Sequence, residues 1–389
     1  MANSAASRLV PGPYSETAVR NAAQECLQEI GGSVTCVFAF VAADFRPHLE
    51  DFLELIQVHG HAPLVVGCSA SGLIGAGVEL EHSTGFSLLF LHLPGTVVTP
   101  FVLRNSQVEE STGPAYWNKI SGLAAGEVDV WMLLANPVNF PIERLLLEWN
   151  KAYPKVPCIG GLGSGGPSGD DIFIFRNREL IEDGSIALAL KGGVRVHPLL
   201  SQGCNPIGHP LAVTGAAKNT LLALGGKPAY EVLASAFESL SDEEKRRAQG
   251  NLFAGLATSE YLDDFKRGDF LIRNILGADA ETGAVTIAAY PRVGQTLQYQ
   301  LRDRHSADED FRERLLALRN VKPFASLMFS CTGRGKNLFG TANHDAGALD
   351  RNFPALPGAG FFCNGEIGPV GGANFVHGYT VSLALFANE

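Results

Sequence analysis

The sequence predicts a mixed α/β protein made of two layered halves, and three observations lead to this prediction. Apolar, β-favouring runs alternate with helical patterns through the first 200 residues. Beyond Gly203, short alternating segments predict a mainly antiparallel sheet accompanied by helices. The 389 residues leave room for two or three domains of about 100–200 residues each. We therefore expect one domain over residues 1–200 and a second over residues 201–389.

The first half begins with a helix predicted over 15–29, because Ser15 can cap its amino end and Gly31 can end it. Four strands and a second helix are expected to follow. They are a buried strand at 34–41, a helix at 47–58, a short strand at 62–72 that ends in small residues, and two strands at 85–92 and 96–103 that flank a Pro94-Gly95 turn. This order predicts a β-α-β-β-β unit.

The same unit recurs further along the first half. Residues 34–105 and 128–200 are predicted to be its two copies. The offset between them is a constant 94 residues, which places Gly67 on Gly161. Self-similarity at a fixed spacing indicates a duplication, so residues 1–200 are expected to form one pseudo-symmetric domain.

The second half is predicted to begin with a short strand and turn near 213–222. Helices are then expected at 228–237, 241–249 and 306–318, and strands at 251–257, 270–276, 284–289 and 296–301. Ser306 and Glu309 have the spacing of a capping box at the start of the third of these helices. This pattern predicts an α+β domain with mainly antiparallel neighbours.

Composition excludes several classes of protein. The net charge is −10 and no Lys/Arg cluster occurs, which argues against nucleic-acid binding. No run of 18 apolar residues occurs and the amino end lacks the basic-then-apolar order of a signal peptide, so we expect a cytoplasmic protein without membrane contact. The seven cysteines are widely spaced without a C-x-x-C, which suggests neither a disulfide framework nor a zinc site. No cofactor is predicted from these patterns.

Two glycine-rich segments near the end of the chain, 329–335 and 360–368, carry the first candidate site. Each is a strand running into glycines, and each leaves one charged side chain, Arg334 or Glu366, with little side-chain cover. We expect Arg334 to pair with a ligand carboxylate or, equally, with Glu366 in a structural ion pair. Glu366 is expected to hold a ligand amine or a backbone N–H group.

His377, Cys331 and Cys363 are expected to converge on the same strand ends. His377 lies on an apolar strand, where a hydrogen-bonded core histidine is more common than a ligand-binding one. A thiol enzyme with His377 as base is an alternative. However, the sequence has no Gly-x-Ser-x-Gly elbow and no carboxylate spaced to orient the histidine, so a non-catalytic site is favoured.

A second candidate site is the small-residue strand end of each copy. Its candidate residues are Gly67, Cys68, Ser69, Ser71 and Gly161. Backbone N–H groups there could cradle an anion or a carboxylate, and a tight turn between packed strands is the equally weighted alternative. The segment is not a Walker loop, because the Lys and Ser/Thr that should follow are missing.

These motifs together resemble the FIST family over nearly the whole chain. The segments at 67–72 and 159–165 are similar to the glycine motifs of a FIST N-terminal half. The segments similar to a FIST C-terminal half are 203–208, 273–276, 293–296, 301–303, which contains Arg302, 331–335 and 360–368, with His377. The resemblance implies a sensory module that binds a small ligand, such as an amino acid, at these residues.

The resemblance also implies how the ligand signal would be passed on. We expect a separate signalling protein as partner, and a homodimer is a further arrangement that the sequence leaves open. A haem-binding nitric-oxide sensor, as in a bacterial branch of the family, is the first alternative. A protein-interaction module in ubiquitin signalling is another, although no F-box fits before residue 15.

Overall fold

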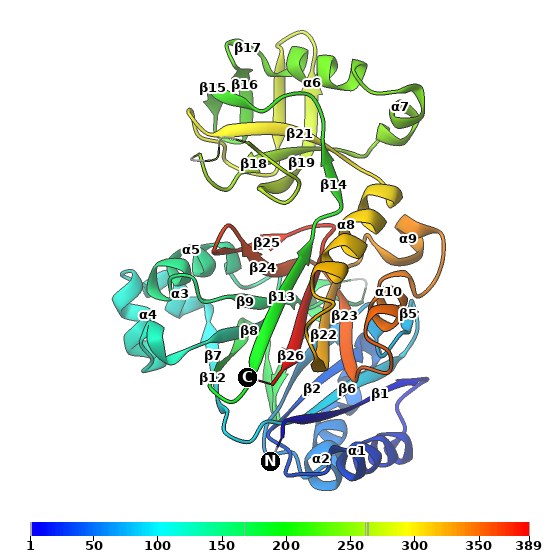
Figure 1. Cartoon of the computed structure of the whole chain (residues 1–389). Helices are drawn as coiled ribbons and strands as arrows, with labels where there is room; N and C mark the ends of the chain where they lie inside the picture. Colours follow the sequence, from blue (N-terminus) through cyan, green and yellow to red (C-terminus); the bar gives the residue numbers. More distant parts are fainter. Residues whose placement is uncertain (1, 167, 261, 263, 389) are drawn as a thin grey trace. The chain divides into compact units, whose positions relative to one another are not determined.

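The computed structural model describes residues 2–166, 168–260, 262 and 264–388, and it confirms the mixed α/β class. The chain forms two compact units, one of residues 1–200 with 312–389 and one of residues 201–311 (Figure 1). This division differs from the expected one at residue 200. The carboxy-terminal segment packs with the first 200 residues because its strands complete their sheets.

The first unit holds three copies of one arrangement of strands and helices, as far as the described residues go. The first copy comprises β1 (Ser4–Pro11), α1 (Glu16–Ile30), β2 (Cys36–Ala42), α2 (Leu49–His59), β3 (Val65–Ala70), β4 (Gly72–Ile74), β5 (Glu79–Glu81) and β6 (Gly85–His92). The second comprises β7 (Val97–Arg104), α3 (Asn105–Glu110), α4 (Pro114–Ser121), β8 (Val130–Ala135), α5 (Ile142–Ala152), β9 (Cys158–Leu162), β10 (Ile174–Arg176), β11 (Glu179–Ile181) and β12 (Gly184–Lys191). The third comprises β13 (Arg195–Ser201), β22 (Pro323–Cys331), α9 (Gly335–Phe339), α10 (His344–Asn352), β23 (Gly358–Cys363), β24 (Glu366–Val370), β25 (Ala373–His377) and β26 (Val381–Ala387).

The three copies exchange hairpins and thereby form three six-stranded sheets of the same order. The sheets are β1-β6-β2-β3-β10-β11, β7-β12-β8-β9-β24-β25 and β13-β26-β22-β23-β4-β5. In each sheet the last two strands come from another copy, so that β10 pairs with β3, β24 with β9 and β4 with β23. The segment 201–311 is therefore an insertion between the first two strands of the third copy.

The sequence analysis found two of these copies and missed the third. It also missed β1, the outer strand of its sheet, whose side chains are mostly half-buried and so lack a clear apolar alternation. The two strands expected as a closing hairpin, β6 and β7, lie in different sheets. These strand pairings result from the exchange of hairpins between copies, which the local sequence pattern does not indicate.

The inner faces of the three sheets share one hydrophobic core. Equivalent alternate residues of β2, β8 and β22, for example Phe38, Met132 and Leu327, lie in it. The outer face of the first sheet packs on α1 and α2, and that of the second packs on α4 and α5. Ser15 caps α1, with its Oγ accepting a hydrogen bond from Ala18 N, and Gly31 ends it in the left-handed conformation, as predicted.

The register of the parallel strand pairs corrects the predicted offset by one residue. Gly67 lies beside Ala39, and the equivalent partner of Leu133 is Gly160, whereas Gly161 was expected there. The third copy places Gly360 beside Met328 in the same way. The second copy is thus one residue shorter between its first two inner strands.

The second unit is an antiparallel barrel with helices. Its elements are β14 (Cys204–Pro206), β15 (Leu211–Ala217), β16 (Thr220–Leu224), β17 (Lys227–Pro228), α6 (Ala229–Glu238), α7 (Asp242–Ala248), β18 (Leu252–Ala257), β19 (Phe270–Asp279), β20 (Ala284–Ile287) and β21 (Thr296–Arg302). The strand order β21-β15-β16-β20-β19-β18 closes because β18 also pairs with β21. The helix α8 (Arg304–Ala317) spans the division between the two units.

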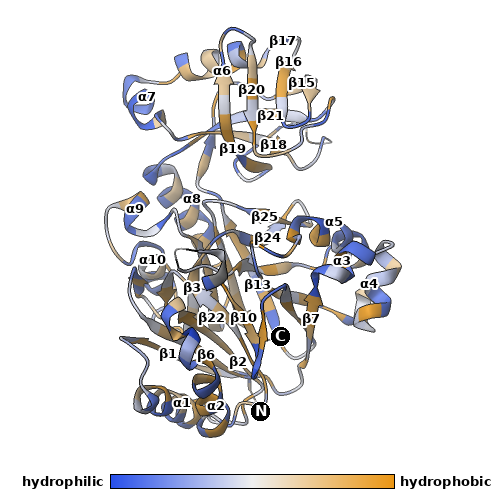
Figure 2. Ribbon diagram, turned by 180° about the vertical axis from the view of Figure 1, so that it is seen from behind, coloured by the Kyte–Doolittle hydropathy of each residue, from blue (hydrophilic) through white to orange (hydrophobic). Residues whose placement is uncertain are grey.

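Hydropathy follows this architecture. Figure 2 shows α7 as hydrophilic, and in the sequence its residues Asp242–Ala248 are almost all charged. Buried apolar side chains of the barrel strands and of α6 form a separate core within the second unit. Among the described residues, no helix is long and apolar enough to cross a membrane.

Candidate functional site

The carboxyl ends of β3, β9 and β23 meet in the first unit, and one buried hydroxyl joins them. The Ser164 Oγ accepts a hydrogen bond from Ser71 N at 2.9 Å and donates one to Phe362 O. Ser164 N in turn donates to Ser69 O at 3.1 Å. The predicted small-residue strand ends of the two copies therefore lie together with the third, and they do so through packed, hydrogen-bonded backbone.

The glycines of this region serve close packing. A Cβ atom on Gly67 would lie 1.7 Å from the carbonyl oxygen of Ala39, and one on Gly161 would lie 2.5 Å from the Cys363 Sγ. The backbone N–H of Ser69 already donates to Phe173 O, and the Ser69 Oγ accepts from Phe173 N. These contacts agree with the packed-turn alternative and leave no anion cradle at Ser69.

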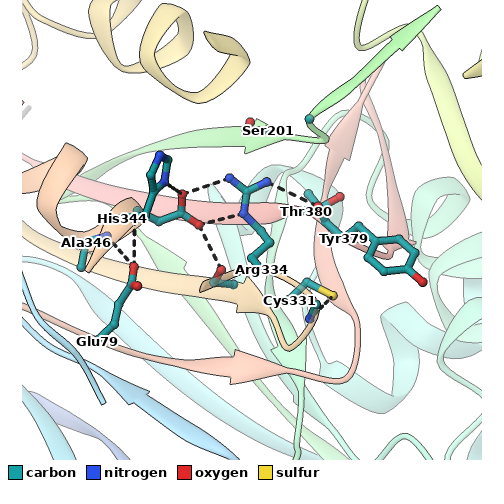
Figure 3. A network of polar contacts seen from close by, with 12 residues as sticks. Glu79, Ser201, Cys331, Arg334, His344, Ala346, Tyr379 and Thr380 are labelled. Carbon is teal, nitrogen blue, oxygen red and sulfur yellow. Dashed lines mark hydrogen bonds and ion pairs between the residues drawn. The ribbon is translucent and has the colours of Figure 1, made fainter. Parts of the chain in front are cut away.

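Arg334 is fully buried and is held by a carboxylate of the protein itself. Its Nε lies 2.7 Å from Asp345 Oδ2 and its Nη2 lies 3.0 Å from Asp345 Oδ1, which makes a bidentate pair. Its Nη1 donates to Tyr379 O, and the guanidinium lies over the Phe339 ring at 5.2 Å. Figure 3 shows Arg334 between His344 on one side and Tyr379 and Thr380 on the other.

The sequence analysis did not name Asp345 as a partner of Arg334. The hypothesised partners were a ligand carboxylate and Glu366, and the structure adds the Asp345 carboxylate. Asp345 lies in the loop-and-helix segment between the two glycine-rich segments, where the pattern of residues does not indicate burial. A ligand carboxylate could reach Arg334 only by displacing Asp345.

Asp345 begins a buried chain of polar groups that includes Glu79. Glu79 Oε1 accepts hydrogen bonds from the backbone N–H groups of Asp345 and Ala346, at 2.9 and 2.8 Å, and so caps α10. Burial and the neighbouring Asp345 charge raise the pKa of Glu79 to about 7. Burial would also raise the pKa of Asp345, but the Arg334 guanidinium and the His344 hydrogen bond outweigh it and hold that pKa well below its usual range.

Glu366 is a carboxyl group in an apolar position. Its equivalents in the other two sheets are Leu73 and Ile174, judged by the strand register. Burial raises the pKa of Glu366 well above its usual value, although a hydrogen bond from Thr380 N to its Oε2, at 3.1 Å, and the charge of Arg334 favour the ionised form. The Glu366 side chain is fully buried, so a ligand amine does not reach it in this conformation.

The candidate thiols and the histidine lie close to Glu366 but are placed as core residues. Cys331 and Cys363 are neighbours on the parallel strands β22 and β23. Burial raises the pKa of Cys68 and of Cys363, which makes these two thiols poor nucleophiles. His377 is buried with its Nε2 3.1 Å from Gly368 O, as the core alternative predicted.

Arg302 belongs to the other unit and is not part of this group. It lies on β21, is buried, and its guanidinium is 5.6 Å from the centre of the Phe253 ring. Among the described residues, no group of three or more His, Cys, Asp or Glu side chains could hold a metal ion.

The second unit has a pocket of about 420 Å³ beside Arg302. The FIST-like segments at 203–208 and 301–303 supply much of its wall. Its lining residues are Asn205, Pro206, Ile207, Glu244, Arg247, Arg267, Leu301, Asp303, His305 and Ser306. The sequence analysis named Arg302 here but not the charged residues of α7, because a charged helix ordinarily indicates a solvent-exposed face.

Arg247 lines this pocket with a side chain that is 32% exposed. Its Nη1 lies 3.0 Å from Asp303 Oδ2, while its buried Nε has no hydrogen-bond acceptor. Asp303 is fully used, because its Oδ1 also accepts a hydrogen bond from Ser306 N at the start of α8. Glu244 supplies a negative charge, and hydrogen bonds from Ser241 lower its pKa.

Comparison with known proteins identifies the family. The FIST N domain model matches residues 35–227 and the FIST C domain model matches residues 229–369, so the chain belongs to the FIST family, as its motifs predicted. An uncharacterized protein of Mycobacterium bovis is 33% identical over 385 residues, and one of Mycobacterium tuberculosis is 34% identical over 384 residues. Each alignment covers 97% of both chains. FIST domains are compatible with a sensory or ligand-binding role.

Solved structures of lower similarity include a cyanuric acid hydrolase. It matches with a TM-score of 0.35 and 10% identity over 100% of both chains. The cyanuric acid hydrolase of A. caulinodans matches with the same TM-score and 8% identity. At these values the likeness bears on neither the reaction nor the ligand of the present protein.

Proposed function

We propose that the protein is a non-catalytic sensory protein that binds a small zwitterion, an amino acid or a related metabolite, in the second-unit pocket. One observation carries this proposal. The pocket brings the partly exposed Arg247 guanidinium and the Glu244 carboxylate together in about 420 Å³. This volume is in the range of about 300–1,000 Å³ that is usual for small-molecule sites.

The two charges suit the two ends of an amino acid. A carboxylate would pair with the Arg247 guanidinium, whose side chain is partly exposed in the pocket. An ammonium group would pair with Glu244, which stays ionised at neutral pH because its pKa is lowered. The strand-end cluster of the first unit is a weaker candidate, because Arg334 already pairs with Asp345 and is completely buried.

A titration of amino acids into the protein, followed by calorimetry, tests the proposal. Glu244→Gln keeps the capping box of α7 but removes the charge, and Arg247→Gln removes the donor. Arg246→Gln is the matched control, because Arg246 is an exposed neighbour on the same helix and does not line the pocket. We expect the affinity to fall about tenfold or more in each pocket variant, as for a lost charge-assisted hydrogen bond of about 1.5–3 kcal/mol, and to stay unchanged in the control.

Absence of saturable binding to the wild-type protein by every amino acid and amino-acid derivative tested would contradict the proposal. Thermal unfolding must accompany the titration, because Arg247→Gln leaves the buried Asp303 carboxylate without its ion pair. If Arg247→Gln both unfolds at a lower temperature and binds less ligand, its weaker binding does not show a lost ligand contact. The decision then rests on Glu244→Gln, which should bind less ligand while keeping its stability.

The sensory part of the proposal requires a partner that distinguishes the ligand-bound from the ligand-free state. A ligand shifts an output only by its differential affinity for two states. Pull-downs with and without the bound amino acid are expected to recover different partners, or different amounts of a second copy of this chain. Identical recoveries, together with turnover of a substrate that Cys331→Ser or His377→Ala abolishes, would favour an enzyme. A stoichiometric Soret band in the visible spectrum would favour the haem sensor.

A further inference from the structure

A second hollow in the barrel unit is largely apolar and lies along α6. We call it the α6 groove; its volume is about 590 Å³. One wall is a single face of α6, formed by Val232, Ser235, Ala236 and Ser239 at helical spacing. The other face of the helix, with Leu233, packs into the barrel core. The helix is therefore fixed in place by one face and offers the other face to the groove.

Two glycines keep the α6 groove open. Gly208 and Gly225 line it, and both have backbone conformations with positive φ, +63° and +56°. A Cβ on Gly208 would meet Ala236 at 3.0 Å and one on Gly225 would meet the Leu211 side chain at 3.2 Å. A side chain at either position would be strained and would crowd the wall of the groove. This geometry allows the surrounding loops to approach α6 without filling the hollow.

The floor of the α6 groove is apolar although it contains a tyrosine. Tyr299 is buried and its hydroxyl donates a hydrogen bond to Ala229 O at 3.0 Å. Its polar end is thus already satisfied, and the ring adds an apolar surface to the side chains of Ile207, Leu211 and Val232. An apolar ligand body fits this surface because burying apolar area is favourable, by about 25 cal/mol per Å².

Among the described residues that line the α6 groove, Lys227 is the charged side chain, and its charge is positive. Lys227 and His209 lie on its exposed rim, and no Asp or Glu is among the described residues that line it. An ammonium group next to an apolar hollow attracts an anion and disfavours a cation. The chemistry required of a ligand is therefore an apolar body with a single negative head.

We propose that the α6 groove binds small amphipathic carboxylates, with the chain or ring against Tyr299 and Val232 and the carboxylate at Lys227. This site goes beyond the amino-acid pocket and does not depend on it. Ile207 lines both hollows, but the ligands differ, since the first pocket carries charges of both signs and the α6 groove carries the positive charge of Lys227.

The test is a titration of the full-length protein with octanoate, octanol and octylamine at low ionic strength, followed by calorimetry. Octanoate is expected to bind saturably with one site and more tightly than the two other compounds. Lys227→Gln should weaken octanoate about three- to fivefold, as for an exposed ion pair, and added salt should reduce this difference. Ser235→Phe, an exposed substitution on the groove face of α6, should block all three compounds by filling the hollow.

Two control variants separate these effects from general ones. Lys266→Gln removes an exposed lysine of the same unit outside the groove, and Leu222→Phe adds a ring at an exposed position of β16 that does not line it. Both are expected to bind octanoate like the wild type. The proposal is overturned if octanoate does not bind, if the three head groups bind equally, or if the controls weaken binding as much as Lys227→Gln and Ser235→Phe do. Loss of amino-acid binding in Arg247→Gln leaves these results unaffected, so the two sites can fail separately.

Discussion

Replacing Asp345 by asparagine should strongly destabilise the first unit. Asp345 is the carboxylate that neutralises the fully buried Arg334, through two hydrogen bonds of 2.7 and 3.0 Å. Asparagine keeps the size and one acceptor oxygen but removes the charge. The guanidinium would keep its contacts with the Tyr379 carbonyl, at 3.4 Å, and with the Phe339 ring, at 5.2 Å, but neither of these carries a negative charge.

The expected magnitude follows from the burial of both groups. Breaking a buried ion pair by removing one partner costs about 3–5 kcal/mol, because an uncompensated charge stays in a medium of low dielectric constant. Glu79 and Glu366 limit this cost, since loss of the negative charge at Asp345 favours ionisation of Glu79 and both carboxyl groups can offset part of the cation. We therefore expect a loss of about 3 kcal/mol in the free energy of unfolding, at the lower end of that range.

Urea denaturation at pH 7, followed by far-ultraviolet circular dichroism, measures this loss. Glu182→Gln is the control, because Glu182 forms an exposed ion pair of the same length, 2.7 Å, with Arg46. That change should cost less than about 1 kcal/mol. The double variant Arg334→Met/Asp345→Leu, which removes both charges, should regain most of the stability lost in Asp345→Asn.

A cost below about 1 kcal/mol for Asp345→Asn, equal to that of the exposed control, would refute the reasoning. The reasoning would also be refuted if the double variant were less stable than Asp345→Asn, as expected when two independent losses add. Either result would mean that the guanidinium is solvated in solution, and the cluster would then again be a candidate site for a ligand carboxylate.

Three further predictions concern the core of the first unit. The protonated form of Glu79 stabilises the fold below its unfolded pKa of about 4.5, and this contribution is lost as the pH rises through about 7. The free energy of unfolding of Glu79→Gln should therefore rise relative to the wild type by on the order of 1–3 kcal/mol between pH 5 and pH 8, which urea denaturation at both pH values measures. Gly160→Ala should prevent stable folding or lower the unfolding temperature by more than 10 °C (roughly 3 kcal/mol or more), because its Cβ would lie 1.8 Å from the Leu133 carbonyl oxygen. The control Gly126→Ala, whose Cβ would have no atom within 4 Å, should leave the unfolding temperature nearly unchanged. Ser164→Ala should cost about 1–3 kcal/mol in urea denaturation by leaving backbone groups at two strand ends unpaired, and an unchanged midpoint would contradict the bridging role of its hydroxyl.

Features that depend on neighbouring residues could be predicted from the amino-acid sequence. Ser15 and Gly31 fixed the ends of α1 because caps act on backbone groups within one turn. The repeated order of apolar strand, helix and small-residue strand at a spacing of 94 residues indicated the first two copies. The ordered glycine motifs identified the FIST family, which the two domain models confirm.

Contacts between residues far apart in the chain depend on the tertiary structure and could not be predicted from local sequence patterns. The third copy of the repeat was hidden because residues 201–311 separate β13 from β22 in the chain. The exchange of hairpins depends on which sheet edge a hairpin can reach, and no local pattern encodes that choice. Arg334 pairs with Asp345, which the sequence analysis did not name, because α10 carries the aspartate to the buried guanidinium. The pocket at Arg247 likewise forms because α7 lies beside the ends of β14 and β21. Two charged side chains of this helix thereby line a candidate ligand site.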